Sequence, residues 1–369
     1  MNFDFSQDQK LLQKSAQTLL KEQSSLAQVR KVMEAGEPYD RALWKHIAEA
    51  GWLGSTIPEQ YGGNGFGSLE LVLLAEELGA SLACVPFSSS VYFAIEALLL
   101  AGSEEQKKKY LPDLASGKTI GCFAMAEGLG SPSPGALKAT VTEGKLTGAK
   151  TPVVDGEIAH LAVVVAQGAK GSALFLVGLE GPGVKRKRLE SMDLTRPQAA
   201  VAFDAAPAEL LGSEKDGPAL IAELLNRAAV PLAFEQLGGA VRCQKMALEY
   251  AKSRYAFGRP IGSFQAIKHK IVDMLVISDL ARSNCYYAAW ALENKTDLPI
   301  AAATARIAAT EAFEFCSREN IQTHGGIGFT WEADPHLFFK RSKLLALWLG
   351  SPPLWRERLL AALEQKYVA

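Results

Sequence analysis

The chain has 369 residues, of which 48% are hydrophobic and 21% charged, with 39 basic and 40 acidic side chains. This length allows two or three domains with a large core. The net charge of -1 argues against nucleic acid as the main partner, because phosphate binding needs a basic excess.

Residues 1–118 are predicted to form an N-terminal helical domain. Ser6 and Gln9 have the spacing of a capping box, and leucines follow at helical spacing. The glycine-rich stretch 57–67 is predicted to be a loop. Further helices are predicted at 39–54, ended by Gly51 or Gly54, at 68–79, capped by Ser68 and ended by Gly79, and from Ser103 with Gln106 to the residue before Pro112.

The pattern changes twice along the rest of the chain. Residues 119–212 contain short apolar runs separated by Gly, Pro or Asp, which is typical of an antiparallel barrel or sandwich. Residues 213–369 are predicted to be helical, with long helices at 217–254, 263–294 and 297–323. Helices of this length indicate a four-helix bundle that neighbouring subunits continue. The predicted fold class is α+β.

Three features bear on the compartment. The five cysteines are scattered and odd in number, which is typical of reduced thiols in the cytosol. The N-terminus has no basic stretch followed by an apolar one, so we expect no signal peptide. The apolar stretch 81–102 is interrupted by serines, Pro86 and Glu96, so we expect no membrane span. The sequence therefore predicts a cytoplasmic protein.

Several kinds of site are not predicted. The sequence has no His-Glu-x-x-His, and its five histidines are too dispersed for a metal cluster, so we expect no metal. It has no Gly-x-Ser-x-Gly of a serine nucleophile. The glycines of 128–135 do not form Gly-x-Gly-x-x-Gly and precede a β-type segment, which argues against a Rossmann dinucleotide site.

One stretch of the predicted bundle has residues suited to a dinucleotide. Residues 254–274, RYAFGRPIGSFQAIKHKIVDM, place Arg254, Phe257 and Gln265 around a Gly/Pro turn between two helices. An arginine can bind a pyrophosphate through two hydrogen bonds, an aromatic ring can stack on a base, and an amide can bind hydroxyl or phosphate oxygens. Alone, this stretch is more simply explained as an interhelix turn.

A second stretch, IQTHGGIGF at 321–329, lies at the predicted end of a long helix. Adjacent glycines usually end a helix or let another group approach the backbone. Amides at such an end suit an anion or a ribose. The candidate residues here are Gln322, Thr323, His324, Gly325 and Gly326. Together with the first stretch they indicate a site for the end of a dinucleotide.

These two stretches and GWLGSTIPEQYGGNGFG at 51–67 resemble motifs of the acyl-CoA dehydrogenase family, and the similarity covers nearly the whole chain. The resemblance implies an N-terminal helical domain (1–118), a β domain (119–212) and a C-terminal bundle (213–369). It also implies FAD as cofactor, desaturation of an acyl-CoA thioester between its α and β carbons, an electron acceptor such as an electron-transfer flavoprotein, and tetramers or dimers. In this family the neighbouring subunit reaches the adenosine diphosphate end of FAD, through positions that match the two stretches.

The positions that would face the chain's own flavin depart from the family pattern. Where the family has Thr-Glu-Pro-Gly-Ala-Gly-Ser-Asp, residues 126–135 have Ala126 for the hydroxyl and Pro132 for the aspartate. Where the family has Trp-Ile-Thr, residues 152–154 are Pro-Val-Val. The glutamate that acts as catalytic base in many members matches Leu349, which cannot take a proton.

A second position used for the base in some members falls near 226–229, where there is no carboxylate. Glu235 lies on the same helical face, roughly 10 Å further along the helix. It is a fallback base, and we prefer its interpretation as an ordinary interface or capping carboxylate.

The chain keeps the residues that would contact a neighbour's FAD and lacks those that would face its own flavin and substrate. This pattern suggests a subunit that completes a partner's FAD site and lacks the usual catalytic glutamate. Heterotetramers of two related subunits occur in the family, including members that act on steroid side chains in bacteria. Three alternatives stay open: a homo-oligomeric dehydrogenase with a displaced base, a non-redox flavin-dependent acyl-CoA lyase, and a structural subunit without an active site.

Overall fold

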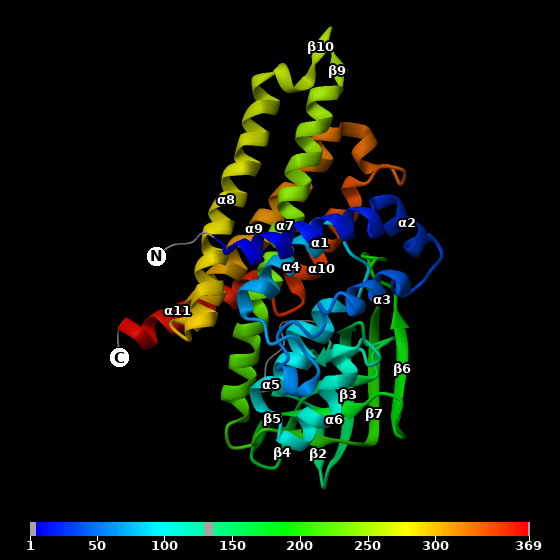
Figure 1. The fold of residues 1–369 in the computed structure, drawn as a ribbon, viewed down its shortest axis with the longest axis vertical. Coiled ribbons are helices and arrows are strands. Elements are labelled where there is room, and N and C mark those ends of the chain that lie inside the picture. Colours follow the sequence, from blue (N-terminus) through cyan, green and yellow to red (C-terminus); the bar gives the residue numbers. More distant parts are fainter. Residues whose placement is uncertain (1–4, 129–135, 368–369) are drawn as a thin grey trace. The chain divides into compact units, whose positions relative to one another are not determined.

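The computed structural model describes residues 5–128 and 136–367, and Figure 1 shows its ribbon. The chain divides into two compact units, each built from segments far apart in the sequence. The bundle unit comprises Met1–Arg30, Val72–Ala83 and Ala229–Ala369; the sheet unit comprises Lys31–Leu71 and Cys84–Ala228. The predicted order of helices, sheet and helices is confirmed. The domain boundaries at 118 and 212 stay a prediction.

The N-terminal region is helical, as predicted. Capping boxes at Ser6 and Ser103 are both present, each with the glutamine three residues later bonded back to the cap. Asp40 caps a third helix through the amide of Leu43. The elements are α1 (Gln7–Gln23), α2 (Leu26–Glu34), α3 (Arg41–Glu49), η1 (Glu59–Tyr61), α4 (Ser68–Ala80), the π-helix η2 (Ser88–Ile95), α5 (Glu96–Ala101) and α6 (Glu104–Ala115).

The predicted helix end at Gly79 lies within one residue of the observed end of α4 at Ala80, whereas the predicted end before Pro112 is wrong. Gly79 permits a close backbone approach in the bundle unit, because a Cβ there would lie 1.9 Å from the carbonyl oxygen of Glu235. Gly238 makes the reciprocal approach to Glu76, also at 1.9 Å. Pro112 lies inside α6, where it removes one backbone donor. The helix continues because Leu111, Leu114 and Ala115 are buried on its core side.

The sheet unit contains one sheet of eight described strands, in the order β6-β7-β3-β2-β4-β5-β8 with β1 paired to β4. The apolar runs of β4 and β5 are buried along almost their whole length. The strands are β1 (Gly121–Ala124), β2 (Thr140–Thr142), β3 (Lys145–Val154), β4 (Leu161–Gly168), β5 (Gly171–Gly178), β6 (Val184–Leu189), β7 (Gln198–Pro207) and β8 (Glu209–Leu211).

The expectation of a purely antiparallel sheet needs correction, because the sheet is mixed. Most neighbours are antiparallel, but β1 and β2 each pair with β4 in parallel. Between β1 and β4 the chain forms the antiparallel β2–β3 hairpin. The chain reverses between β2 and β3 and again between β3 and β4, so β4 runs in the same direction as β2 and β1. Short apolar runs do not record the direction in which a strand enters a sheet.

The C-terminal region carries three long helices whose ends lie within two residues of the predicted ones. In Figure 1, α8 and α9 run side by side, and their closest faces are rich in alanine. None of the described helices is long and apolar enough to cross a membrane. The elements are α7 (Gly217–Ser253), β9 (Tyr255–Ala256), β10 (Arg259–Pro260), η4 (Ile261–Ser263), α8 (Gln265–Asn294), α9 (Leu298–His324), η5 (Gly325–Phe329), α10 (Pro335–Leu347) and α11 (Pro352–Tyr367).

Candidate functional site

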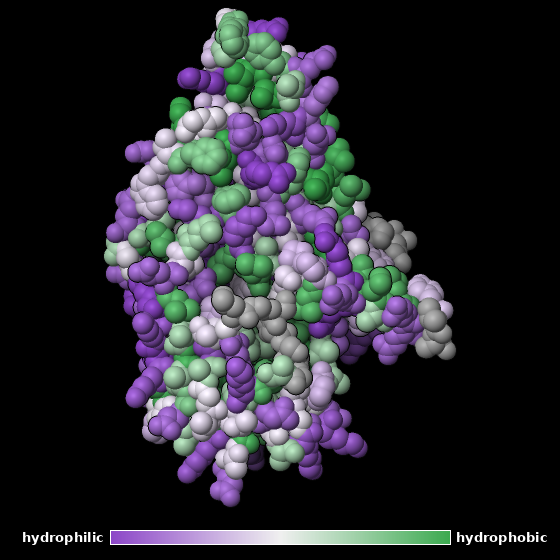
Figure 2. Space-filling view, turned by 180° about the vertical axis from the view of Figure 1, so that it is seen from behind, coloured by the Kyte–Doolittle hydropathy of each residue, from purple (hydrophilic) through white to green (hydrophobic). Residues whose placement is uncertain are grey.

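The turn between α7 and α8 presents an aromatic ring to the outside. The two-residue turn of the β9–β10 hairpin consists of Phe257 and Gly258, with φ of +52° and +77°. Positive φ at both positions is the geometry of a type I′ turn, and it is uncommon for a residue as bulky as phenylalanine. The Phe257 side chain is 95% exposed. Figure 2 shows hydrophobic surface at the tip that carries this hairpin.

Two further candidate residues frame the hairpin. Arg254 follows the last residue of α7, and its carbonyl accepts the amide of Ile261, which closes the base of the hairpin at 2.8 Å. Its side chain is exposed. Gln265 is the first residue of α8 and is also exposed. The hairpin therefore holds a guanidinium, an aromatic ring and an amide within one short segment.

The end of α9 provides open backbone. Gly325 has a φ of +63°, and a Cβ added at Gly325 or Gly326 would meet no atom within 4 Å. Gln322 is exposed, whereas Thr323 is buried and donates its hydroxyl to the carbonyl of Glu319 at 2.7 Å. The proton of the Thr323 hydroxyl is thus used within the helix.

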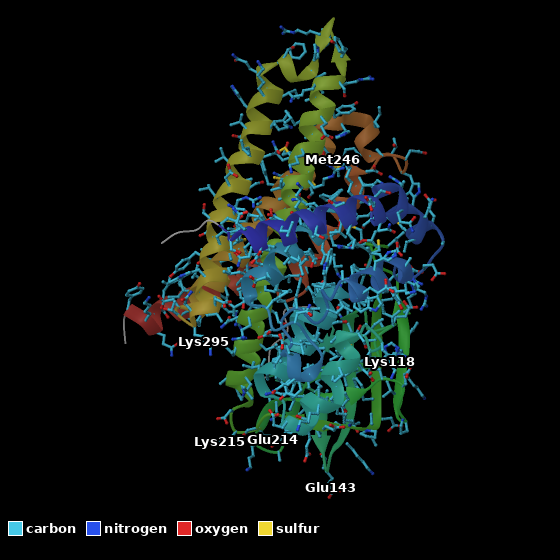
Figure 3. The ribbon with its side chains drawn as sticks, viewed as in Figure 1. Lys118, Glu143, Glu214, Lys215, Met246 and Lys295 are labelled. Atoms are coloured by element: carbon cyan, nitrogen blue, oxygen red, sulfur yellow. The ribbon has the colours of Figure 1, made fainter. Side chains whose placement is uncertain are left out.

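His324 connects this helix end to the hairpin side of the bundle. Its ring stacks on Tyr250, near the end of α7, with centroids 4.1 Å apart. One turn earlier, the amide of Asn320 lies 3.9 Å from the sulfur of Met246, which Figure 3 labels on α7. Nδ1 of His324 lies 2.8 Å from the carbonyl of Asn320, so we assign its proton to Nδ1. The end of α9 therefore packs against the last turns of α7, which lead into the hairpin.

The position that matches the family's usual base is apolar and held firmly. Leu349 is 2% exposed. The indole of Trp355 donates to its carbonyl at 3.2 Å. Just before it, the buried guanidinium of Arg306 donates to the carbonyl of Leu345 in the last turn of α10. No proton acceptor is offered by the side chain at residue 349.

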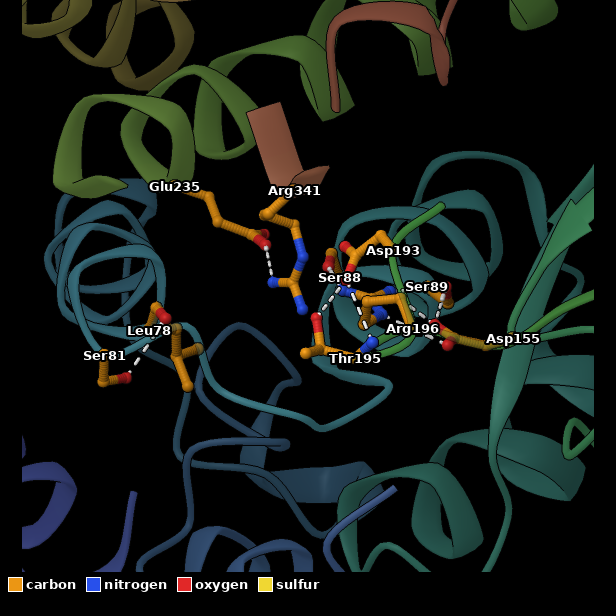
Figure 4. A network of polar contacts seen from close by, with 10 residues as sticks. All are labelled: Leu78, Ser81, Ser88, Ser89, Asp155, Asp193, Thr195, Arg196, Glu235 and Arg341. Atoms are coloured by element: carbon orange, nitrogen blue, oxygen red, sulfur yellow. Dashed lines mark hydrogen bonds and ion pairs between the residues drawn. The ribbon is translucent and has the colours of Figure 1, made fainter. Parts of the chain in front are cut away.

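Glu235, the fallback base, lies in a buried ion pair. Its carboxylate is 3.6 Å from the guanidinium of Arg341 on α10, and both side chains are at most 5% exposed. Figure 4 shows the two side chains directed toward each other. This arrangement supports a structural role for Glu235.

In the sheet unit, the segments that match the family's flavin-facing positions bond to each other. The amide of Thr151 donates to the carbonyl of Ala126, and the amide of Gly128 donates to the carbonyl of Thr151, both at 2.8 Å. Val153 and Val154 are buried. These segments therefore offer apolar side chains, and their amides at 128 and 151 are already used. Pro132 lies outside the described residues.

A buried ion pair stabilises these same segments. The ammonium of Lys150 lies 2.6 Å from the carboxylate of Glu127, which also accepts the amides of Lys138 and Ala139. Burial alone would raise the pKa of Glu127, but the bonds from Lys150 and the two amides outweigh it and lower that pKa. Burial also lowers the pKa of Lys150, and Glu127 counteracts this only in part.

A second buried network was not predicted from the sequence. Arg196 is fully buried and pairs with Asp155, the residue directly after β3. It also donates to the hydroxyls of Ser88 and Ser89 at the start of η2 (Figure 4). No local pattern predicts this network, because its members lie up to 108 residues apart. It fixes the end of β3 to the π-helix within the sheet unit.

The segment after η5 contains a buried histidine. The ring of His336 stacks on Trp331 with centroids 5.3 Å apart, and its Nε2 lies 3.1 Å from the Trp331 carbonyl. Its Nδ1 is buried and has no hydrogen-bond partner among the described residues. Burial lowers the pKa of His336; the carbonyl of Trp331 and Asp334 oppose this, and the cations Lys340 and Arg30 add to it.

This lowered pKa predicts a dependence of stability on pH. The unfolded chain takes up the His336 proton near pH 6.5, whereas the folded chain does so only at lower pH. We therefore expect the free energy of unfolding to fall as the pH drops below 6.5 and to level off below the folded-state pKa. Urea denaturation between about pH 7.5 and pH 5 checks this. His336→Asn should show a smaller fall; an equal fall in both proteins would contradict the assignment.

Comparison with known protein families identifies the class of protein. Family models match the chain twice, as the acyl-CoA dehydrogenase N-terminal domain at residues 6–118 and the acyl-CoA dehydrogenase C-terminal domain at residues 215–363. The chain therefore belongs to the acyl-CoA dehydrogenase family. Members of this family are oxidoreductases that bind FAD.

Individual relatives are similar over nearly the whole chain. The chain is 32% identical over 348 residues to the acyl-CoA dehydrogenase IpdE2 of Mycobacterium tuberculosis, with 94% of each chain covered. Its fold matches the structure of the ChsE4–ChsE5 complex from Mycobacterium tuberculosis with a TM-score of 0.91 at 29% identity, covering 99% of both chains. It matches the Tcur3481–Tcur3483 steroid ACAD with a TM-score of 0.90 at 30% identity, covering 98% and 99%.

Proposed function

We propose that this chain takes part in the FAD-dependent α,β-desaturation of an acyl-CoA thioester, as the subunit that completes the FAD site of a related partner chain. The observation that carries this proposal is a contrast between the residues for the adenosine diphosphate end of FAD and the position of the catalytic base. Residues suited to the adenosine diphosphate end are present, and the helix end at His324 packs against Tyr250, four residues before Arg254. The position of the usual base is a buried leucine, Leu349.

The residues at the bundle end fit the diphosphate and adenosine part of FAD. Exposed Arg254 supplies a charged fork for the pyrophosphate, and Phe257 supplies a ring face for a flat base. Gly325 and Gly326 leave room for an anion to approach the backbone. His324, with its proton on Nδ1, presents Nε2 as an acceptor for a hydroxyl or amino group.

The chemistry divides between the two chains in this proposal. Bound FAD supplies the acceptor for the hydride that leaves the β carbon of the thioester. The α-proton needs a carboxylate. Leu349 offers none and Glu235 is held by Arg341, so we assign that base to the partner chain. The ChsE4–ChsE5 complex and the Tcur3481–Tcur3483 steroid ACAD support a partnership of two related chains and a lipid or steroid acyl group.

The remaining partners follow from the same proposal. They include an electron acceptor for the flavin, and an electron-transfer flavoprotein would suit that role. We propose a cytoplasmic location, in keeping with the five buried cysteines.

The visible absorption spectrum of the purified protein tests the proposal. We expect the chain to be colourless when purified alone and yellow when purified with a related acyl-CoA dehydrogenase chain that has the catalytic glutamate. A lone chain that is yellow and bleaches with an acyl-CoA would instead be a homo-oligomeric dehydrogenase. A yellow lone chain that acyl-CoA does not bleach would favour the non-redox lyase, and a colourless complex would favour a structural subunit.

A further inference from the structure

The segment that contains the open backbone, residues 325–334, is mostly exposed. Among its first five residues only Gly328 is buried; a Cβ there would lie 2.5 Å from the carbonyl of Ile321, so the segment folds back onto the end of α9. Phe329 is 77% exposed. A segment with so few buried contacts has little packing of its own to keep it in one conformation. Its conformation therefore depends on a small number of fixed contacts.

One of these contacts comes from the N-terminal helices of the bundle unit. Arg30 on α2 donates from Nη1 to the carbonyl of Trp331 at 2.7 Å and from Nη2 to the carbonyl of Ala333 at 2.8 Å. Its Nε donates to the carboxylate of Asp334 at 2.7 Å. The side chains of Arg30 and Asp334 are 16% and 33% exposed. A single guanidinium thus bonds three of the last four residues of the segment.

The geometry of these bonds is specific to arginine. The guanidinium is planar and carries its donors in fixed directions, so it can bind three acceptors at once without further ordering. A lysine at residue 30 would keep the charge but could not reproduce this fork. His336 provides a second contact to the carbonyl of Trp331. The two side chains hold the far end of the segment, while the Tyr250–His324 stack holds its beginning.

We infer that Arg30 is a positioning residue for cofactor binding: it keeps residues 325–334 in the conformation in which Gly325 and Gly326 receive the partner's FAD. The inference rests on the proposed function. A segment that is already ordered loses less conformational entropy when a ligand binds it, so the binding is tighter. Arg30 therefore contributes to FAD affinity without touching the cofactor.

The test uses the flavin complex of this chain with its related partner. FAD is removed and titrated back, with Arg30→Gln, Arg30→Lys and a control variant, Arg282→Gln, in this chain. Arg282 also forms a partly buried pair in the bundle unit, with Glu76 at 2.8 Å, but it lies on α8 and not against the segment. We expect Arg30→Gln to raise the Kd for FAD roughly tenfold, Arg30→Lys to raise it less, and Arg282→Gln to leave it unchanged.

A second readout does not depend on the flavin. Hydrogen exchange of the FAD-free complex should show faster exchange of the amides of 325–334 in Arg30→Gln, and unchanged exchange there in Arg282→Gln. Equal FAD affinity in wild type and Arg30→Gln, or equal losses in Arg30→Gln and Arg282→Gln, would overturn the inference. The proposed function fails on a different result, namely unchanged FAD affinity when Arg254 is replaced.

Discussion

Replacing Glu235 by alanine is expected to lower the free energy of unfolding by about 3–5 kcal/mol, because it removes the carboxylate that pairs with the buried guanidinium of Arg341. A buried charged group that loses its counterion still carries the cost of its lost hydration, without the attraction that offset it. Both partners belong to the bundle unit, so the loss acts on the packing of α7 against α10. Urea denaturation followed by circular dichroism measures it.

Two controls separate this structural role from catalysis. The double variant Glu235→Leu/Arg341→Leu removes both charges and should recover part of the loss. Glu311→Ala breaks an exposed pair with Arg356 and should change the free energy of unfolding by less than about 1 kcal/mol. If Glu235 were instead the base, Glu235→Gln would slow turnover about 10²–10⁴-fold while leaving stability unchanged, and our assignment would be wrong.

Replacing Arg254 by alanine is expected to raise the Kd for FAD about 10- to 100-fold in the flavin complex. The reason is the loss of charge-assisted hydrogen bonds to the pyrophosphate. The thermal unfolding of the chain alone should not change, since the Arg254 side chain is exposed. Titration of the FAD-free complex, followed by the quenching of flavin fluorescence, gives the affinity directly.

Lys252 provides the matched control for this experiment. It is an exposed cation in the last turn of α7, two residues before Arg254, which lies just after the helix. Lys252→Ala should leave FAD affinity unchanged. An equal weakening by both variants would indicate a general effect of positive charge, and no weakening by Arg254→Ala would contradict the proposed cofactor contact.

The features that the sequence predicted correctly depend on local patterns. Ser6 and Ser103 have their capping glutamines three residues away, and the long helices have uninterrupted periodicity. The turn at Phe257–Gly258 and the glycines at 325–326 can also be recognised from a few adjacent residues. The family resemblance rests on such short stretches, which is why the fold class could be predicted.

Other features were decided by contacts between distant segments. Gly79 looks only like a helix end, yet a glycine is also required there because the backbone at Glu235 comes within reach of a Cβ. Thr323 has a hydroxyl that could bind a ligand, but this hydroxyl donates a hydrogen bond to the carbonyl of Glu319. Local patterns contain no information about which segment will pack against a given position.

The same distinction holds for the candidate site. The sequence by itself determined which residue types are present for a diphosphate and which are missing for a base. Only the tertiary structure decided that His324 meets Tyr250, that Arg341 pairs with Glu235, and that Arg30 bonds a segment three hundred residues away. These contacts arise because burying side chains and satisfying backbone groups selects partners by their position in space, and proximity along the chain plays no part in that selection.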